Sequence, residues 1–355
     1  MEEVLRNGIG FRRFFKHMPV ATLIIGAFWI FILILGTVLG FSLTNLLSDA
    51  VQRFGMWGLL VLAMVPSIQS GTGPNFALPI GVCCGLLAIV ISIEIGLTGG
   101  LLFAVAAILA VAIGCVMGYV YGQLMNAVKG SEMAIATYTG FSVTFLFCVI
   151  WTALPFANPY IMWFIGAGLR NYISLEPLGA VKVLDNIMHF SIGGISIPTG
   201  MILVVLIASL LMWLFFRSKP GISIMAVGMN PRFAAVSGID VDKSRTLANM
   251  ISTALAAVGI LVYAQSFGLV QLYDGPMLMA FPAVAAVLVG GASAHKSKVI
   301  NVIVGTIIFQ GLITNGPPVF GRLLQGADMT DAVRMVVQNG VILYALAQMR
   351  GGGKS

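Results

Sequence analysis

Long stretches without a charged residue alternate with short polar segments along the whole chain. A helix needs about 20 apolar residues to cross the hydrocarbon core of a bilayer. Stretches of that order predict ten transmembrane helices. Two lie within residues 54–93, with an interruption near 71–75, and the other eight lie at 19–41, 99–121, 135–155, 198–216, 246–273, 275–295, 299–321 and 335–349.

The composition supports a membrane protein. Of the 355 residues, 59% are hydrophobic and 9% are charged, whereas a soluble domain carries about 25% charged residues. The 42 glycines suit close packing of transmembrane helices. We therefore predict an all-α integral membrane protein with one transmembrane domain over residues 1–355. The apolar stretch at 19–41 has no clear cleavage site, so we expect it to be an uncleaved first span.

The net charge of +7 raises the alternative of nucleic-acid binding. The basic residues, however, lie in short segments between the apolar stretches, which is typical of positive-inside topology. With the N-terminus in the cytoplasm, the ten-span arrangement places 14 Lys and Arg residues inside and 5 outside. We expect both termini to be cytoplasmic, residues 1–18 to be a cytoplasmic N-terminal segment, lipid to surround the spans, and no nucleic-acid partner. The long outer segment around 178–188 is expected to hold a short helix.

Catalytic and metal-binding patterns are absent from the sequence. The four cysteines, Cys83, Cys84, Cys115 and Cys148, lie in apolar stretches without metal-ligand spacing and are interpreted as small core residues. No phosphate-binding loop, metal site or catalytic triad is found, so we expect no cofactor and no enzymatic activity in this chain. Glu94 is the acid closest to lying within a span, where it would be either functional or interfacial. His295 is interpreted as an interfacial cytoplasmic residue.

The cytoplasmic loop at 218–243 contains the signals of a short capped helix. Asn230 is a good N-cap, Pro231 suits the first helical position and Gly238 suits the residue after the last turn. The small residues Ala234 and Ala235 lie between them. Such a helix could dock in a groove of another protein, or it could simply connect two spans.

The segment 221–243 resembles the cytoplasmic loop of bacterial ABC importer permeases of the ribose/galactose-type and branched-chain amino acid family. The matching residues are Gly221, Ala226, Gly228, Asn230, Ala234, Ala235, Gly238, Ile239, Val241 and Lys243. One spacing differs, because two residues separate Ala235 from Gly238 where the family pattern has three. Further matches occur at 135–137 and 285–291, so the resemblance covers nearly the whole chain.

The resemblance implies a permease in the bacterial inner membrane that works with ABC ATPase subunits. It also implies an extracytoplasmic solute-binding protein and a second permease copy or a paralogue. ATP hydrolysis is then expected in the separate ATPase, and residues 218–243 are expected to form the coupling loop. The residues expected to couple to the ATPase are Gly228, Asn230, Pro231, Arg232, Ala234, Ala235 and Gly238.

Two departures from the family pattern leave the cargo open. The sugar permeases usually carry an acidic residue between the second and third spans, where this chain has no acid in 71–81. After Gly290 and Gly291, residues 294–297 replace a second Gly-Gly. Both changes also suit one member of a heteromeric permease pair.

The interrupted stretch at 71–75 is the best candidate for a substrate pathway. Gly73 and Pro74 are expected to shape a helix break, and Asn75, Phe76, Thr137 and Phe281 to line the path. A similar Gly-Pro pair at 275–276 fits an inverted repeat of spans 2–5 and 7–10, although coincidence is an equal alternative.

The span centres carry no charge, which favours a small neutral polar solute, because an unpaired ion there is costly. The resemblance implies a monosaccharide moved inward by alternating access, and leaves a nucleoside or a branched-chain amino acid open. A self-contained ion-coupled transporter is the alternative of another class and would need buried charges near the span centres. A membrane enzyme would need a polar catalytic cluster.

Overall fold

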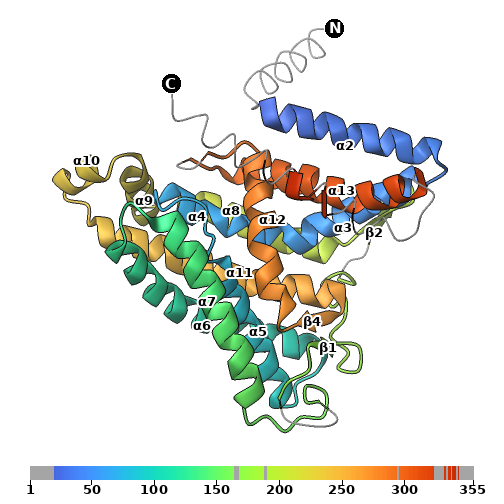
Figure 1. Cartoon of the computed structure of the whole chain (residues 1–355), viewed down its shortest axis with the longest axis horizontal. Coiled ribbons are helices and arrows are strands. Elements are labelled where there is room, and N and C mark those ends of the chain that lie inside the picture. The colour runs from blue at the N-terminus through green and yellow to red at the C-terminus, as the bar shows by residue number, and fades with distance from the viewer. Residues whose placement is uncertain are drawn as a thin grey trace.

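The computed structural model describes residues 20–163, 168–187, 190–293 and 296–323, together with 332, 335–336, 338–340 and 343. The chain is mostly helical (Figure 1). The helices are α2 (Val20–Val38), α3 (Leu43–Leu62), α4 (Met64–Gln69), α5 (Leu78–Glu94), α6 (Gly99–Ala127), α7 (Glu132–Ala153), α8 (Thr199–Phe215), α9 (Lys219–Met229), α10 (Pro231–Val236), α11 (Val241–Phe267), α12 (Asp274–Val289) and α13 (Val299–Leu323).

The apolar stretches of the sequence form helices of membrane-spanning length. Five helices in the described part of the chain are long and apolar enough to cross a bilayer, with α3 and α4 together counting as one, and the bent pair of α8 and α9 raises the number to six. The shorter apolar helices α2, α5 and α12 fall where further spans are predicted. The multi-pass membrane character is thus confirmed. The tenth span, at 335–349, lies largely outside the described residues, so the count of ten stays a prediction.

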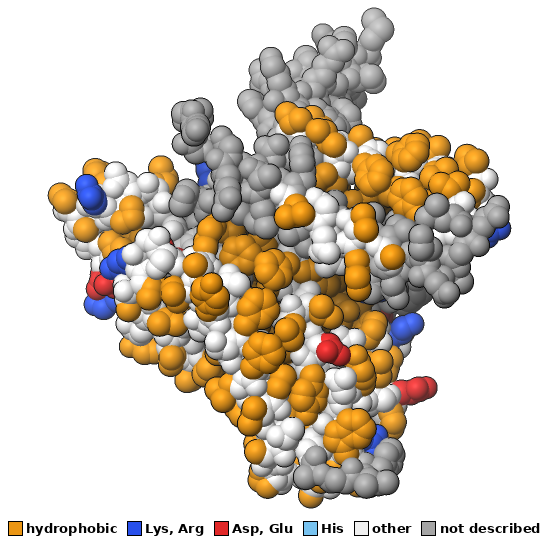
Figure 2. All heavy atoms as spheres, viewed as in Figure 1, with side chains coloured by type: hydrophobic (Ala, Val, Ile, Leu, Met, Phe, Trp, Pro, Cys, Tyr) orange, Lys and Arg blue, Asp and Glu red, His pale blue; other side chains and the backbone are white. Residues whose placement is uncertain are grey.

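The outer helices present apolar side chains to their surroundings rather than to the protein. Ile108 and Val116 on α6 are 71% and 65% exposed, and Val149 on α7 is 65% exposed. Hydrophobic side chains cover the face over α6, α7 and α12 (Figure 2). An apolar surface this extensive is typical of helices that face the hydrocarbon of a bilayer.

The centre of the fold is α11, which packs against α3, α5 and α6. Glycines spaced four residues apart on α6 allow this close packing. A β-carbon on Gly118 would lie 2.7 Å from the α-carbon of Met250, and one on Gly122 would lie 2.8 Å from that of Thr246. Because lipid supplies no hydrophobic force between helices, such small-residue contacts stabilise the bundle.

The helix pairings fit the predicted inverted repeat. Helices α3, α5 and α6 correspond in order to α11, α12 and α13. In such a repeat, the α11–α6 contact corresponds to the α3–α13 contact, and the α11–α5 contact corresponds to the α3–α12 contact. The α5–α6 contact likewise corresponds to the α12–α13 contact. All of these helix pairs are in contact. The repeat remains a prediction, since its last span lies largely outside the described residues.

Four short strands modify the all-helical prediction. Strand β1 (Tyr172–Ser174) pairs with β4 (Leu269–Gln271), and β2 (Phe190–Ile192) pairs with β3 (Ile195–Ile197), both in antiparallel fashion. The prediction of a short helix around 178–188 is wrong, because residues 181–187 form turns. Gly179 and Lys182 have φ values of +63° and +54°, which a right-handed helix does not admit. The backbone N–H of Lys182 instead donates to the carbonyl oxygen of Gln265.

The two ends of α11 lie at opposite ends of the molecule. Lys243 is in its first turn, whereas Lys182 bonds to Gln265 near its last turn. A helix of 27 residues is about 40 Å long, enough to cross a bilayer. In Figure 1, α10 lies at one end of the bundle and the β1–β4 pair at the other. This arrangement fits the predicted placement of Lys182 and Lys243 on opposite faces.

Candidate functional site

The helix break predicted from Gly73 and Pro74 is present between α4 and α5. Gly71 and Gly73 have φ values of +80° and +82°, a region that favours glycine. The Ser67 hydroxyl donates to the carbonyl oxygen of Gly73 at 2.8 Å, and the Thr72 hydroxyl donates to the carbonyl oxygen of Ser67 at 2.9 Å. These side chains replace the backbone hydrogen bonds that the helix loses, which keeps an irregular segment stable inside the bundle. Pro74 is buried in this segment.

Asn75 lies behind the predicted pathway and fastens the break to α11. Its amide donates to the Ser252 hydroxyl at 2.8 Å, and its carbonyl oxygen accepts from the Ala77 N–H at 3.0 Å. Ser252 in turn donates to the carbonyl oxygen of Ala63 at 2.6 Å. Asn75 is 1% exposed and is not among the residues that line the neighbouring cavity. Asn75 therefore holds the helix break against α11 and does not line this cavity.

Three of the predicted lining residues come together around one small cavity. Phe76 lies in the break, Thr137 on α7 and Phe281 on α12, and they line one narrow, partly open cavity that has no room for a water molecule. The Phe76 and Phe281 ring centroids are 5.8 Å apart. The Thr137 hydroxyl donates to the Met133 carbonyl oxygen at 2.9 Å. Residues from three distant parts of the sequence therefore close a single uncharged site.

Four further residues line this cavity and were not predicted from the sequence: Pro79, Phe141, Met277 and Ala280. Phe141 lies one helical turn beyond Thr137, and its ring centroid is 6.4 Å from that of Phe281. Met277 and Ala280 precede Phe281 by four and one residues. Phe141 follows Thr137 by four residues and Met277 precedes Phe281 by four, and residues four apart share a helix face. This spacing was the signal available in the sequence.

The capped helix predicted in the loop at 218–243 is present as α10. The Asn230 side-chain oxygen accepts from the Phe233 N–H at 3.0 Å, Pro231 begins the helix, and Gly238 has a φ of +81°. Ala234 is fully buried, whereas Arg232 and Ala235 are exposed. The predicted coupling residues therefore divide into those that build α10 and those on its surface.

The surface of α10 carries exposed apolar side chains. Phe233 and Val236 on α10 are 68% and 90% exposed, and Met229 at the end of α9 is 86% exposed. α10 projects at one edge of the molecule, where Lys and Arg side chains are also seen (Figures 1 and 2). Large apolar side chains beside a basic residue are typical of surfaces that bind another protein.

Gly228 connects the loop to the helix break. A β-carbon on Gly228 would overlap the carbonyl oxygen of Gln69 and would lie 3.0 Å from the Gly71 nitrogen. Gln69 also donates from its side-chain amide to the carbonyl oxygen of Ser297. The end of α9 therefore rests directly on the segment where α4 ends and the break begins.

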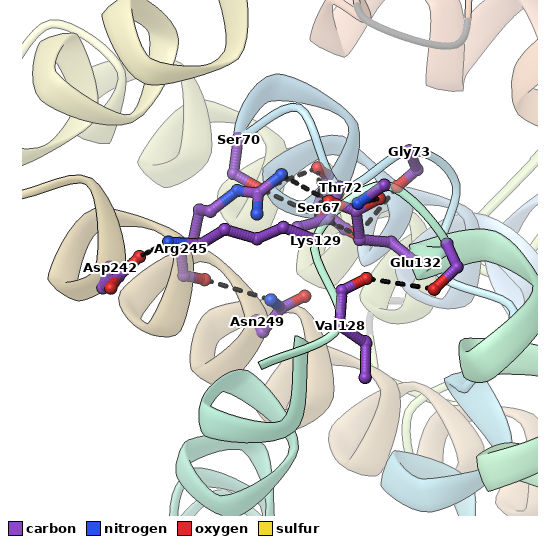
Figure 3. Close-up of polar contacts among 12 residues, drawn as sticks. Ser67, Ser70, Thr72, Gly73, Val128, Lys129, Glu132, Asp242, Arg245 and Asn249 are labelled. Atoms are coloured by element: carbon purple, nitrogen blue, oxygen red, sulfur yellow. Dashed lines mark hydrogen bonds and ion pairs between the residues drawn. The ribbon is translucent and has the colours of Figure 1, made fainter. Parts of the chain in front are cut away.

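Charged side chains gather where α7 and α11 begin (Figure 3). Arg245 bonds to Glu132 at 2.7 Å and Lys129 bonds to Asp242 at 2.5 Å. Asp240 caps α11 by accepting from the Lys243 N–H at 3.0 Å. This bond and the Lys243 ammonium hold the pKa of the Asp240 carboxyl below its usual range.

The remaining singled-out residues have structural surroundings or lie outside the described part. Glu94 ends α5 and accepts from the backbone N–H groups of Ala157 and Asn158 at 3.0 and 3.1 Å. His295 lies outside the described residues. Cys83 and Cys84 are buried. Among the described residues, no group of His, Cys, Asp and Glu side chains could hold a metal ion.

Comparison with known proteins places this architecture in a family. Residues 20–346 match the family described as "Branched-chain amino acid transport system / permease component". No solved structure matches the chain.

Three curated relatives from Escherichia coli are transport permeases. The chain is 26% identical to the galactofuranose transporter permease protein YtfT of strain K12, over 80% of this chain and 87% of the relative. It is 28% identical to the D-allose transport system permease protein AlsC of strain K12, over 56% and 60%. It is 24% identical to the autoinducer 2 import system permease protein LsrD of O157:H7, over 82% and 79%.

The family match spans residues 20–346, which include both the helix break and the loop at 218–243. The function class predicted from the loop is therefore confirmed at the level of the family. The chain belongs to the permease components of the branched-chain amino acid transport system family, which includes the sugar permeases of ABC importers.

Proposed function

We propose that this chain is the membrane-spanning permease of an ATP-driven importer for a small neutral polar solute, most simply a monosaccharide. The observation that carries the proposal is the cavity at the helix break, which is lined by three aromatic rings and one hydroxyl, with no charged residue. Binding sites of this kind fix a neutral solute by apolar contact and a few polar groups. Two of the three relatives named above transport monosaccharides, galactofuranose and D-allose.

In this proposal, the cavity corresponds to a closed state of the pathway. Phe76, Phe141 and Phe281 leave no passage for water, so solute entry requires at least one ring to move. Gly228 joins this break to the loop that ends in α10. We infer that an ATPase subunit docks on the exposed residues of α10 and changes the packing at the break, which is an alternating-access mechanism. A binding protein on the other face would deliver the solute, and a second permease, identical or paralogous, would complete the transporter.

An amino acid is disfavoured as cargo by the same cavity. A branched-chain amino acid carries a carboxylate and an ammonium group, and the lining offers no countercharge to either. An ion-coupled mechanism would need ionisable side chains beside the cavity, and among the described residues none lines it. A nucleoside, with its aromatic base, is compatible with the three rings and is the outcome that would change the substrate class.

The proposal is tested by reconstituting the transporter in proteoliposomes with its ATPase and its binding protein. Uptake is measured with labelled D-allose, D-galactose, D-ribose, uridine and L-leucine, each with and without internal ATP. ATP-dependent uptake of a monosaccharide is expected. Uptake of uridine and of no sugar would show that the substrate is a nucleoside. Solute uptake driven by an ion gradient without an ATPase would refute the proposal of an ATP-driven importer.

A further inference from the structure

The Glu132–Arg245 ion pair is buried, unlike the other ion pairs of the described chain. The two side chains are 14% and 8% exposed, and the Arg245 guanidinium contacts a Glu132 oxygen at 2.7 Å. The second Glu132 oxygen accepts from the Gly130 N–H at 2.9 Å. A buried pair resists separation strongly, because removal of one partner leaves an uncompensated charge. The two backbones that carry these residues are therefore constrained to move together.

Arg245 belongs to the coupling side of the protein. It lies in the second turn of α11, and the N-cap of that helix, Asp240, is four residues after the end of α10 at Val236. The backbone from α10 to Arg245 contains no long loop that could absorb a displacement. A movement of α10 is thus passed to the first turns of α11.

Glu132 belongs to the cavity side. It begins α7, and the next residue, Met133, lies against the helix break, since a β-carbon on Gly73 would be 2.9 Å from its methyl carbon. The same helix supplies Thr137 and Phe141 to the cavity. A displacement of the first turn of α7 therefore reaches both the break and the cavity lining.

Helices α7 and α11 make little other contact. In the part of the chain that the structure describes, α7 packs mainly on α5, and α11 packs on α3, α5 and α6. Figure 3 shows the ion pair drawn with the hydroxyl cluster of the break. The pair is the strong polar connection between these two helices at the α10 end of the molecule.

We propose that the Glu132–Arg245 pair, called here the inner ion pair, transmits the movement of α10 to α7 and thereby links ATP hydrolysis to opening of the cavity. Glu132 and Arg245 are positioning residues in this mechanism, because neither lines the cavity. The inference rests on the proposed function as an ATP-driven permease.

The neighbouring Lys129–Asp242 pair provides a matched control. It joins the turn before α7 to the first turn of α11, next to the turn that carries Arg245, but its side chains are 50% and 56% exposed. Exposed ion pairs contribute little to stability because water screens them. Loss of the Lys129–Asp242 pair removes an ion pair near the start of α11 but leaves the Glu132–Arg245 contact between α7 and α11 intact.

The test compares ATP hydrolysis and monosaccharide uptake in the same proteoliposomes, with the sugar that the wild-type transporter takes up best. The variants are Glu132→Gln, Arg245→Gln, the reversed pair Glu132→Arg with Arg245→Glu, the neutral pair Glu132→Leu with Arg245→Met, and the control Lys129→Gln. Co-purification of the ATPase and membrane insertion are measured for each. The neutral pair removes both charges, so it inserts even if a single variant does not.

We expect the neutral pair and any inserted single variant to bind the ATPase and hydrolyse ATP while uptake per ATP falls roughly tenfold, within the usual range of coupling between sites. The reversed pair should recover part of the wild-type uptake per ATP. In Lys129→Gln, uptake per ATP should stay within about twofold of the wild-type value. A neutral pair with the wild-type ratio would overturn the inference, as would a reversed pair no better than the neutral one. Absence of ATP-driven uptake in the wild type would instead overturn the proposed function.

Discussion

Gly228 and Gly71, which are 157 positions apart in the sequence, meet backbone to backbone: a β-carbon on Gly71 would lie 3.1 Å from the α-carbon of Gly228. Gly228 is the next-to-last residue of α9, the helix that precedes α10, and Gly71 lies where the break begins after α4. The loop expected to meet an ATPase and the segment expected to meet the solute are therefore in direct contact.

Replacement of Gly228 by alanine should separate these two segments. The new methyl group would overlap the Gln69 carbonyl oxygen, and overpacking of this kind costs about 1–3 kcal/mol. We expect loss of uptake with normal binding of the ATPase, because α10 itself is unchanged. Gly100→Ala is the matched control, since its β-carbon would meet its nearest neighbour, Val183, at 3.8 Å. Equal uptake by both variants would contradict the role of the contact.

Substitutions on α10 should act on partner binding. Ala235 is exposed, so Ala235→Asp places a charge on the proposed docking surface, and Ala235→Ser serves as its conservative control. Gly238→Val forces a β-branched residue into a φ of +81°, a backbone conformation that costs roughly 1–2 kcal/mol. Both Ala235→Asp and Gly238→Val should insert normally and lose uptake. Full uptake with normal ATPase co-purification in both would remove the docking assignment.

The aromatic lining is tested by two phenylalanines one turn apart on α7. Phe141 faces the cavity, whereas Phe145 is 56% exposed on the outer surface. Phe141→Ala should change the uptake rate at least about fivefold, which corresponds to ~1 kcal/mol in activation free energy, and Phe145→Ala should not. The measurement is initial uptake rate at equal membrane content. Indistinguishable rates for the two variants would place the pathway elsewhere.

Asn75 should contribute to stability more than to solute contact. Asn75→Leu leaves the Ala77 N–H without its partner in a buried segment, and an unsatisfied buried group costs about 1–3 kcal/mol. We expect a lower midpoint of thermal unfolding in detergent. A double-mutant cycle with Ser252→Ala measures the coupling of the two residues, which are bonded at 2.8 Å. Additive effects in the cycle would show that the bond contributes nothing.

Topology is tested by single cysteines at two exposed lysines. Lys182 and Lys243 lie near opposite ends of α11. In a variant without native cysteines, Lys182→Cys should react with an impermeant thiol reagent in intact cells, and Lys243→Cys should react only after the membrane is opened. Reaction of both in intact cells would refute the ten-span arrangement with cytoplasmic termini.

Local features of this protein could be predicted from the sequence. Hydropathy located the spans, because a charge-free stretch of sufficient length has one favourable solvent, the bilayer. The caps of α10 followed from Asn230, Pro231 and Gly238, since capping depends on backbone groups within a few residues. The break at Gly73 was also readable, because a φ above zero favours glycine.

Contacts between distant segments were decided by the tertiary structure alone. Hydropathy does not say how a lipid-exposed helix is rotated, so Phe141 was missed and Asn75 was expected in the lining although its side chain bonds to Ser252. Charges near span ends report topology but not partners, so the pairing of Glu132 with Arg245 was not foreseen. The outer segment around Lys182 turns instead of forming a helix because its N–H bonds to Gln265 of α11. The sequence by itself determined which segments form long apolar helices, and the packing of glycines and polar side chains determined which of them meet.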